Sequence, residues 1–107
     1  MPDLTDREKR VGLQLPLDVS GLDVAGTPFS ESTRSLNVSG GGFCFETSRK
    51  LAVGSRVTVH IQLPVPLRRH FGDKPLYRAR AVVCRVERLE GRPLSRVGAR
   101  FLAEVEA

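Results

Sequence analysis

Apolar and polar residues alternate with a period of two along most of this chain, which is the pattern of β-strands. The clearest run extends from Arg56 to Leu63. In it Val57, Val59, Ile61 and Leu63 alternate with polar residues, and we predict that these four side chains face the core. Phe43 and Phe45 are spaced in the same way, so both phenylalanines are predicted to lie on one face of a strand.

About six strands are expected. Besides 56–63, the predicted strands cover residues 11–19, 33–37, 43–47, 77–89 and 95–101. Segments rich in glycine, proline and asparagine separate them. Residues 101–107 are the one segment with helical potential, and seven residues are too few for a stable isolated helix. Strands with turns at regular spacing predict an all-β barrel or sandwich.

Prolines mark two special places in this pattern. Pro16 lacks an N–H donor, so the strand that contains it should lie at a sheet edge or be irregular there. Residues 64–75 contain three prolines and Gly72. A connection of this length is expected to carry function or local disorder.

The composition is that of one globular domain. The chain has 107 residues, of which 40% are hydrophobic and 27% charged. No apolar run approaches the roughly 20 residues of a membrane span, and the N-terminal residues do not resemble a signal peptide, so a cytoplasmic location is expected. Cys44 and Cys84 lie in apolar, strand-like runs, which predicts reduced thiols that act as small hydrophobic residues.

Positive charge is concentrated near the C-terminus. The net charge of the chain is +5, but residues 68–100 hold ten lysine and arginine residues against three acidic ones. This excess favours anionic partners, which include phosphate ligands, acidic proteins and nucleic acid. A solvated face that keeps the protein soluble explains most of these arginines equally well.

Two segments together suit an anion-binding site. In the turn 37–42, three successive glycines leave backbone amides unobstructed, and Asn37 and Ser39 can hold the turn or donate to a ligand. The N-terminal segment carries Arg7 and Arg10, whose planar guanidinium groups pair with phosphate or with the O6/N7 edge of guanine. A frayed, charged terminus and an ordinary hairpin turn are the simpler alternatives.

Nothing in the sequence supports catalysis. His60 lies in an alternating strand and His70 in the proline-containing connection, a spacing that does not suit a compact metal site. Ser39 has no credible general base nearby in the sequence, so it is not expected to be a nucleophile. We therefore predict no catalytic residues, no metal ligands and no cofactor.

Taken in order, these segments resemble the PilZ domain, a bacterial receptor module for cyclic di-GMP. The family pattern D/N-x-S-x-x-G is matched by Asn37, Ser39 and Gly42, and residues 53–57 and 97–101 match later landmarks. The resemblance implies a six-stranded antiparallel β-barrel with little or no C-terminal helix, at residues 11–107. Residues 1–10 would form a flexible arginine-bearing arm.

The resemblance also implies a function in bacterial signalling. It points to a non-enzymatic receptor or adaptor that binds cyclic di-GMP through Arg7, Arg10, Asn37, Ser39 and Gly42. The arm would become ordered on the ligand and signal to a protein partner. In this alignment Asp6 occupies the place of the family's first arginine, where it would oppose a phosphate.

Two other functions stay open. The first is a degenerate PilZ adaptor that binds protein partners without nucleotide, which Asp6 and the connection 64–75 favour. The second is a small basic barrel that binds nucleic acid without sequence preference. A single tyrosine and no tryptophan argue against that function, because single-strand binders stack bases on aromatic side chains.

Overall fold

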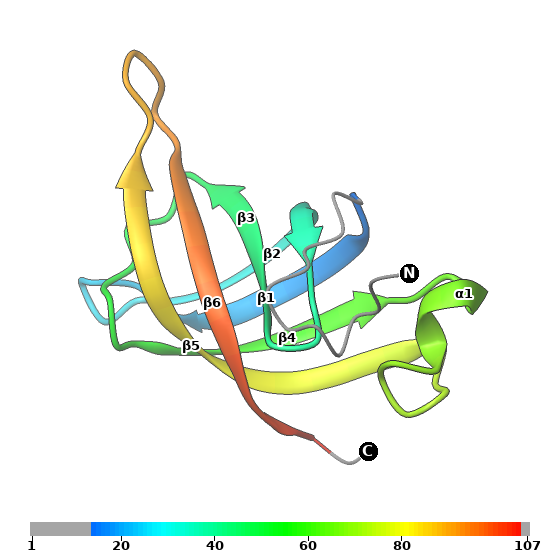
Figure 1. The fold of residues 1–107 in the computed structure, drawn as a ribbon. Coiled ribbons are helices and arrows are strands. Elements are labelled where there is room, and N and C mark those ends of the chain that lie inside the picture. Colours follow the sequence, from blue (N-terminus) through cyan, green and yellow to red (C-terminus); the bar gives the residue numbers. More distant parts are fainter. Residues whose placement is uncertain (1–13, 106–107) are drawn as a thin grey trace.

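The chain forms a closed antiparallel β-barrel, as the sequence predicts (Figure 1). The computed structural model describes residues 14–105. The elements in chain order are β1 (Pro16–Leu22), β2 (Pro28–Val38), β3 (Gly42–Thr47), β4 (Arg56–Gln62), α1 (Val65–Arg68), β5 (Leu76–Arg88) and β6 (Ser95–Glu104). Around the barrel the strand order is β1-β2-β3-β6-β5-β4, with β4 pairing back onto β1.

Alternating side chains fill the barrel. On β4 the predicted inward set, Val57, Val59, Ile61 and the following Leu63, is buried. Phe43 and Phe45 are both fully buried on β3, with ring centroids 5.6 Å apart. These inward positions confirm the strand pattern and its register, because a slip of one residue would move every apolar side chain to the outside.

Pro16 differs from the expectation of an edge strand. β1 pairs with both β2 and β4, since the closed barrel has no edge. Pro16 is instead the first residue of β1: it pairs with Arg34 on β2, whereas the pairing with β4 begins at Leu17. A proline at the first position of a strand breaks no ladder that has already begun.

Two segments without a strand pattern, residues 64–75 and the segment after Phe101, contact the strands of the barrel. The connection 64–75 contains the single-turn helix α1, and its Phe71 is buried, which contradicts local disorder at that residue. The ring of Phe71 lies 4.9 Å from Tyr77 and 6.3 Å from Phe101. Of the segment 101–107 with helical potential, residues 101–104 belong instead to β6, which pairs there with β5.

The phenol of Tyr77 has a raised pKa. Burial against the neighbouring rings, and secondly the nearby Glu104 carboxylate, raise the pKa of this phenol above its usual value. The phenol therefore remains neutral in the aromatic cluster to a higher pH than a free tyrosine would.

Ser35 fastens the chain to β2 at the point where it enters the barrel. The buried Ser35 hydroxyl accepts a hydrogen bond from the Leu15 amide at 2.9 Å, and the Ser35 amide donates to the Leu15 carbonyl at 2.9 Å. Leu15 is itself buried. This reciprocal pair holds the residues just before β1 in register with β2.

Ser35→Ala is therefore expected to destabilise the fold by about 1–3 kcal/mol, because the buried Leu15 amide loses its acceptor. Urea denaturation measures this change, with the exposed β2 residue Ser30→Ala as the control that stays close to the parent protein. If both variants unfold at the same urea concentration as the parent, Ser35 does not anchor the entry to the barrel.

Candidate functional site

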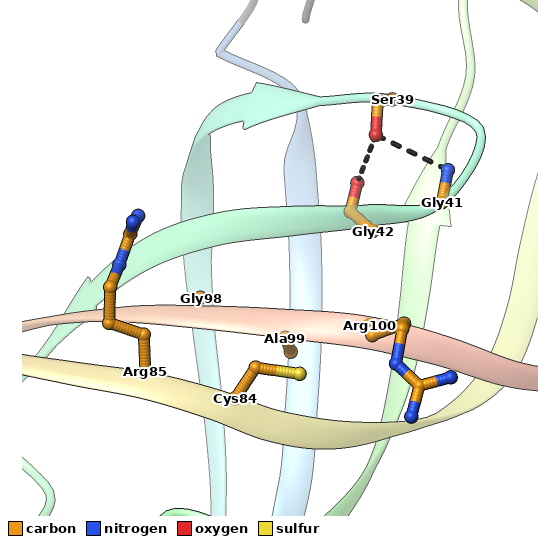
Figure 2. A pocket seen from close by; sticks show the side chains of 8 residues that line it. All are labelled: Ser39, Gly41, Gly42, Cys84, Arg85, Gly98, Ala99 and Arg100. Atoms are coloured by element: carbon orange, nitrogen blue, oxygen red, sulfur yellow. Dashed lines mark hydrogen bonds between the residues drawn. The ribbon is translucent and has the colours of Figure 1, made fainter. Parts of the chain in front are cut away.

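The turn between β2 and β3 is held by its own serine. Ser39 is buried; its hydroxyl accepts a hydrogen bond from the Gly41 amide at 3.2 Å and donates to the Gly42 carbonyl at 3.5 Å (Figure 2). The Ser39 amide donates to the same Gly42 carbonyl at 2.9 Å. The amides of Ser39 and Gly41 thus both donate to acceptors within the turn. The expectation that the turn amides are all free to donate to a ligand is wrong for Ser39 and Gly41.

Gly42 has no room for a side chain. A Cβ atom at this position would overlap the carbonyl oxygen of Ala99 on β6. Gly42 pairs with Arg100 in the β3–β6 ladder, and the Phe101 amide donates to the Gly41 carbonyl at 2.9 Å. The glycine therefore lets the backbone of the turn lie directly against β6.

A cavity of about 290 Å³ opens beside this turn. Ser39, Gly41 and Gly42 line one side of it, and residues from the β5–β6 hairpin line the other (Figure 2). The hairpin residues are Cys84, Arg85, Gly98, Ala99 and Arg100. The sequence motif and the C-terminal basic segment, about 50 residues apart in the chain, are brought together by the pairing of β3 with β6.

Cys84 lies in this cavity because β5 is irregular there. Val83 pairs with Ala99 and Arg85 pairs with Gly98, so Cys84 is an extra residue opposite the step from Ala99 to Gly98. Such a bulge turns a side chain away from its regular face. Cys84 is exposed, in contrast to the buried Cys44, and the prediction that both thiols act as core residues is wrong for Cys84.

Arg85 and Arg100 make the cavity cationic. Both are exposed and line it, and no acidic residue does. Within residues 14–105 neither guanidinium forms an ion pair or side-chain hydrogen bond. Arg85 lies over Gly98, where an added Cβ would be 3.7 Å from its Nη2. Neither arginine was among the predicted ligand-binding residues, although Arg100 lies in the matched segment 97–101 and the basic C-terminal third indicated cationic character.

The other predicted site residues are placed as follows. Ser39 and Gly42 lie together at the cavity. Asn37 lies at the end of β2, half-buried, paired with Cys44 and outside the cavity lining. Arg7 and Arg10 lie outside the described residues, as does the proposed arm at 1–10, so their roles remain predictions.

The two histidines are not part of this site. His60 lies on β4, where its Nε2 accepts a hydrogen bond from Arg78 Nε at 3.4 Å. Among residues 14–105, no three His, Cys, Asp or Glu side chains form a group that could hold a metal ion. In the same range no helix is long and apolar enough to cross a membrane.

Comparison with known proteins agrees with this architecture. The sequence profile of the PilZ domain matches residues 5–107. The solved structure of the Bacillus subtilis inhibitor of motility (MotI/DgrA) superposes with a TM-score of 0.62 at 17% sequence identity, covering 90% of this chain and 41% of that one. This chain thus spans less than half the length of that protein, and the likeness shows the fold. Among curated proteins no significant sequence match was found.

Replacing Gly42 by alanine tests the close approach of β3 and β6. We expect Gly42→Ala to lower the free energy of unfolding by about 1–3 kcal/mol, because the new methyl group can be accommodated only by moving one backbone away from the other. Gly41→Ala is the matched control, since the nearest atom to its Cβ would be Ser39 Oγ at 4.0 Å. Equal destabilisation by both variants in urea would contradict the steric explanation.

Proposed function

This chain belongs to the PilZ domain family, and we propose that it is a cyclic di-GMP receptor that signals to a protein partner and catalyses no reaction. The observation that carries the proposal is the cavity beside the Ser39–Gly42 turn. It has two arginines and no carboxylate in its lining, which suits a ligand with two phosphodiester groups.

The size of the cavity supports a shared site. About 290 Å³ is at the small end of the range of small-molecule sites, roughly 300–1,000 Å³. A cyclic dinucleotide would fill it and still extend outside. In the proposal, Arg7 and Arg10 cover the remainder of the ligand from the N-terminal side. Closure of residues 1–10 over the ligand would create a new surface for the partner.

The turn has a defined part in this proposal. Because Ser39 uses its hydroxyl to hold Gly41 and Gly42, its contribution is to fix the shape of the rim against which the ligand lies. Asn37, which precedes Ser39 by two residues and lies on β2, would contact the part of the ligand that projects out of the cavity. The name of the structural neighbour, an inhibitor of motility, describes a regulator and agrees with a receptor function.

An adaptor that binds protein without nucleotide is the second candidate. Asp6, at the position of the family's first arginine, favours it. Loss of one charged hydrogen-bonding contact costs about 1.5–3 kcal/mol, which is roughly ten- to a hundredfold in affinity. A site with several remaining arginines can lose that much and still bind at micromolar concentration.

Calorimetry with cyclic di-GMP distinguishes the two candidates. We expect binding with a Kd in the micromolar range or below, and no comparable heat with GTP or cyclic AMP. No heat at about 100 μM cyclic di-GMP would favour the adaptor. Binding whose affinity falls steeply with salt and shows no preference for this nucleotide would favour nucleic acid instead.

Substitutions in the N-terminal segment test the alignment. Asp6→Arg should raise the affinity for cyclic di-GMP by about tenfold, because it removes a repelling carboxylate and adds a bidentate donor. Arg10→Ala should lower it by a similar factor with little change in thermal stability. Arg56→Ala is the control, because this exposed arginine on β4 lies outside the cavity. If Asp6→Arg has no effect while Arg10→Ala abolishes binding, the alignment at Asp6 is wrong.

A further inference from the structure

We propose that Arg85 and Arg100 bind a phosphate group of the ligand from the barrel side and that Cys84 lies directly beneath it. This inference deepens the proposed function and rests on it for the identity of the nucleotide. It assigns the phosphate contact of the barrel to two strand residues that lie outside the N-terminal arginine segment and the 37–42 motif. It also makes an exposed thiol part of the floor of the site.

The two arginines line one cavity from two neighbouring strands. Figure 2 shows Cys84 and Arg85 next to each other on β5 and Arg100 on the neighbouring strand β6, with the Cys84 thiol directed toward the Arg100 side. Arg100 is paired with Gly42, so it starts from the strand position next to the turn. Arg85 follows the bulge at Cys84 and lies over Gly98. Two cations that approach a small cavity from two strands can contact one anion together.

Another arginine of β6 does have acidic residues beside it, which makes their absence from the cavity informative. Arg96, also on β6, has Glu46 Oε2 3.6 Å from one guanidinium nitrogen and Glu87 Oε1 4.0 Å from the other. Arg85 and Arg100 have no such partner within residues 14–105. Carboxylates of the fold therefore offset the positive potential at Arg96, whereas no described carboxylate pairs with the two cavity arginines.

The single exposed thiol reports this potential. Cys84 is accessible and Cys44 is buried, and the chain has no other cysteine. Iodoacetate and iodoacetamide alkylate a thiolate by the same displacement of iodide, but only iodoacetate carries a negative charge. The ratio of their rates at Cys84 therefore measures the local potential, because any change in thiol ionisation affects both reagents equally.

In the full chain at low salt, we expect the iodoacetate-to-iodoacetamide rate ratio at Cys84 to exceed that of a cysteine in a neutral peptide by about fivefold. Arg85→Gln and Arg100→Gln should each lower the ratio toward the peptide value. Arg80→Gln is the matched control, because Arg80 is an exposed arginine of the same strand that does not line the cavity. All three positions are exposed, so the variants are expected to fold, which circular dichroism verifies.

Ligand protection completes the experiment. Cyclic di-GMP or inorganic pyrophosphate should slow the alkylation of Cys84 by neutral iodoacetamide. In Arg85→Gln and Arg100→Gln the concentration for half-protection should rise about tenfold, while Arg80→Gln leaves it unchanged. Protection by pyrophosphate alone, lost in both variants, supports the phosphate site and contradicts the cyclic di-GMP function.

Another result would overturn the arginine site without affecting the receptor function. Calorimetric binding of cyclic di-GMP that is unchanged in both arginine variants, with Cys84 alkylated at the same rate when the ligand is bound, overturns this inference and leaves the receptor function intact. The inference is also overturned if neither phosphate compound protects Cys84, or if the rate ratio in the parent protein equals that of the peptide.

Discussion

The candidate site depends on the close approach of two backbones at Gly42. The turn after β2 lies directly against β6 because residue 42 has no side chain, and the Phe101 amide fixes the contact through the Gly41 carbonyl. This contact joins β3 to β6 in the closed strand order, and it also defines one wall of the cavity. Barrel closure and the formation of the site are thus consequences of the same local packing.

The bulge at Cys84 on β5 then places reactive and charged side chains at the cavity. A regular β5 would alternate inward apolar and outward polar side chains, as β4 does. The extra residue at Cys84 interrupts this alternation and leaves both Cys84 and Arg85 exposed at the cavity. The bulge costs some regular pairing. Aromatic packing of Phe101 on β6 against Phe43 on β3 and Tyr77 on β5, with Phe71 of the 64–75 connection against Tyr77, contributes stability that offsets this cost.

Much of the fold could be predicted because it depends on local alternation. The inward residues of β4 and the two phenylalanines of β3 follow from period-two patterns. Together with the turn residues, these patterns predict a barrel or a sandwich, and the closed six-stranded barrel is what the resemblance to the PilZ domain implies. The turn between β2 and β3 follows from the glycines of segment 37–42, although Asn37 and Val38 belong to β2 and Gly42 to β3. Its internal hydrogen bonds could not be predicted, because the sequence is equally compatible with a Ser39 hydroxyl that holds the turn and one that donates to a ligand.

What escaped prediction depends on pairing between distant strands. The role of Ser35 requires Leu15 to lie across from it, and the exposure of Cys84 requires a register shift against β6. Arg85 and Arg100 become site residues only because β6 lies beside β3; in the sequence they are two of many arginines. Of the two alternatives for Pro16, an edge position or a local irregularity, the edge position is wrong for the same reason, since alternation does not reveal that a sheet closes on itself.

The central claim is that cyclic di-GMP binds in the cavity between the Ser39–Gly42 turn and the β5–β6 hairpin. Chemical-shift mapping on the full, isotope-labelled chain tests it most directly. The account predicts that the ligand shifts the amide signals of residues 39–42, 84–85 and 98–100, while those of α1 and the β1–β2 turn at 23–27 remain in place. Signals that do not move at the cavity, or that move only at other basic residues, would contradict it.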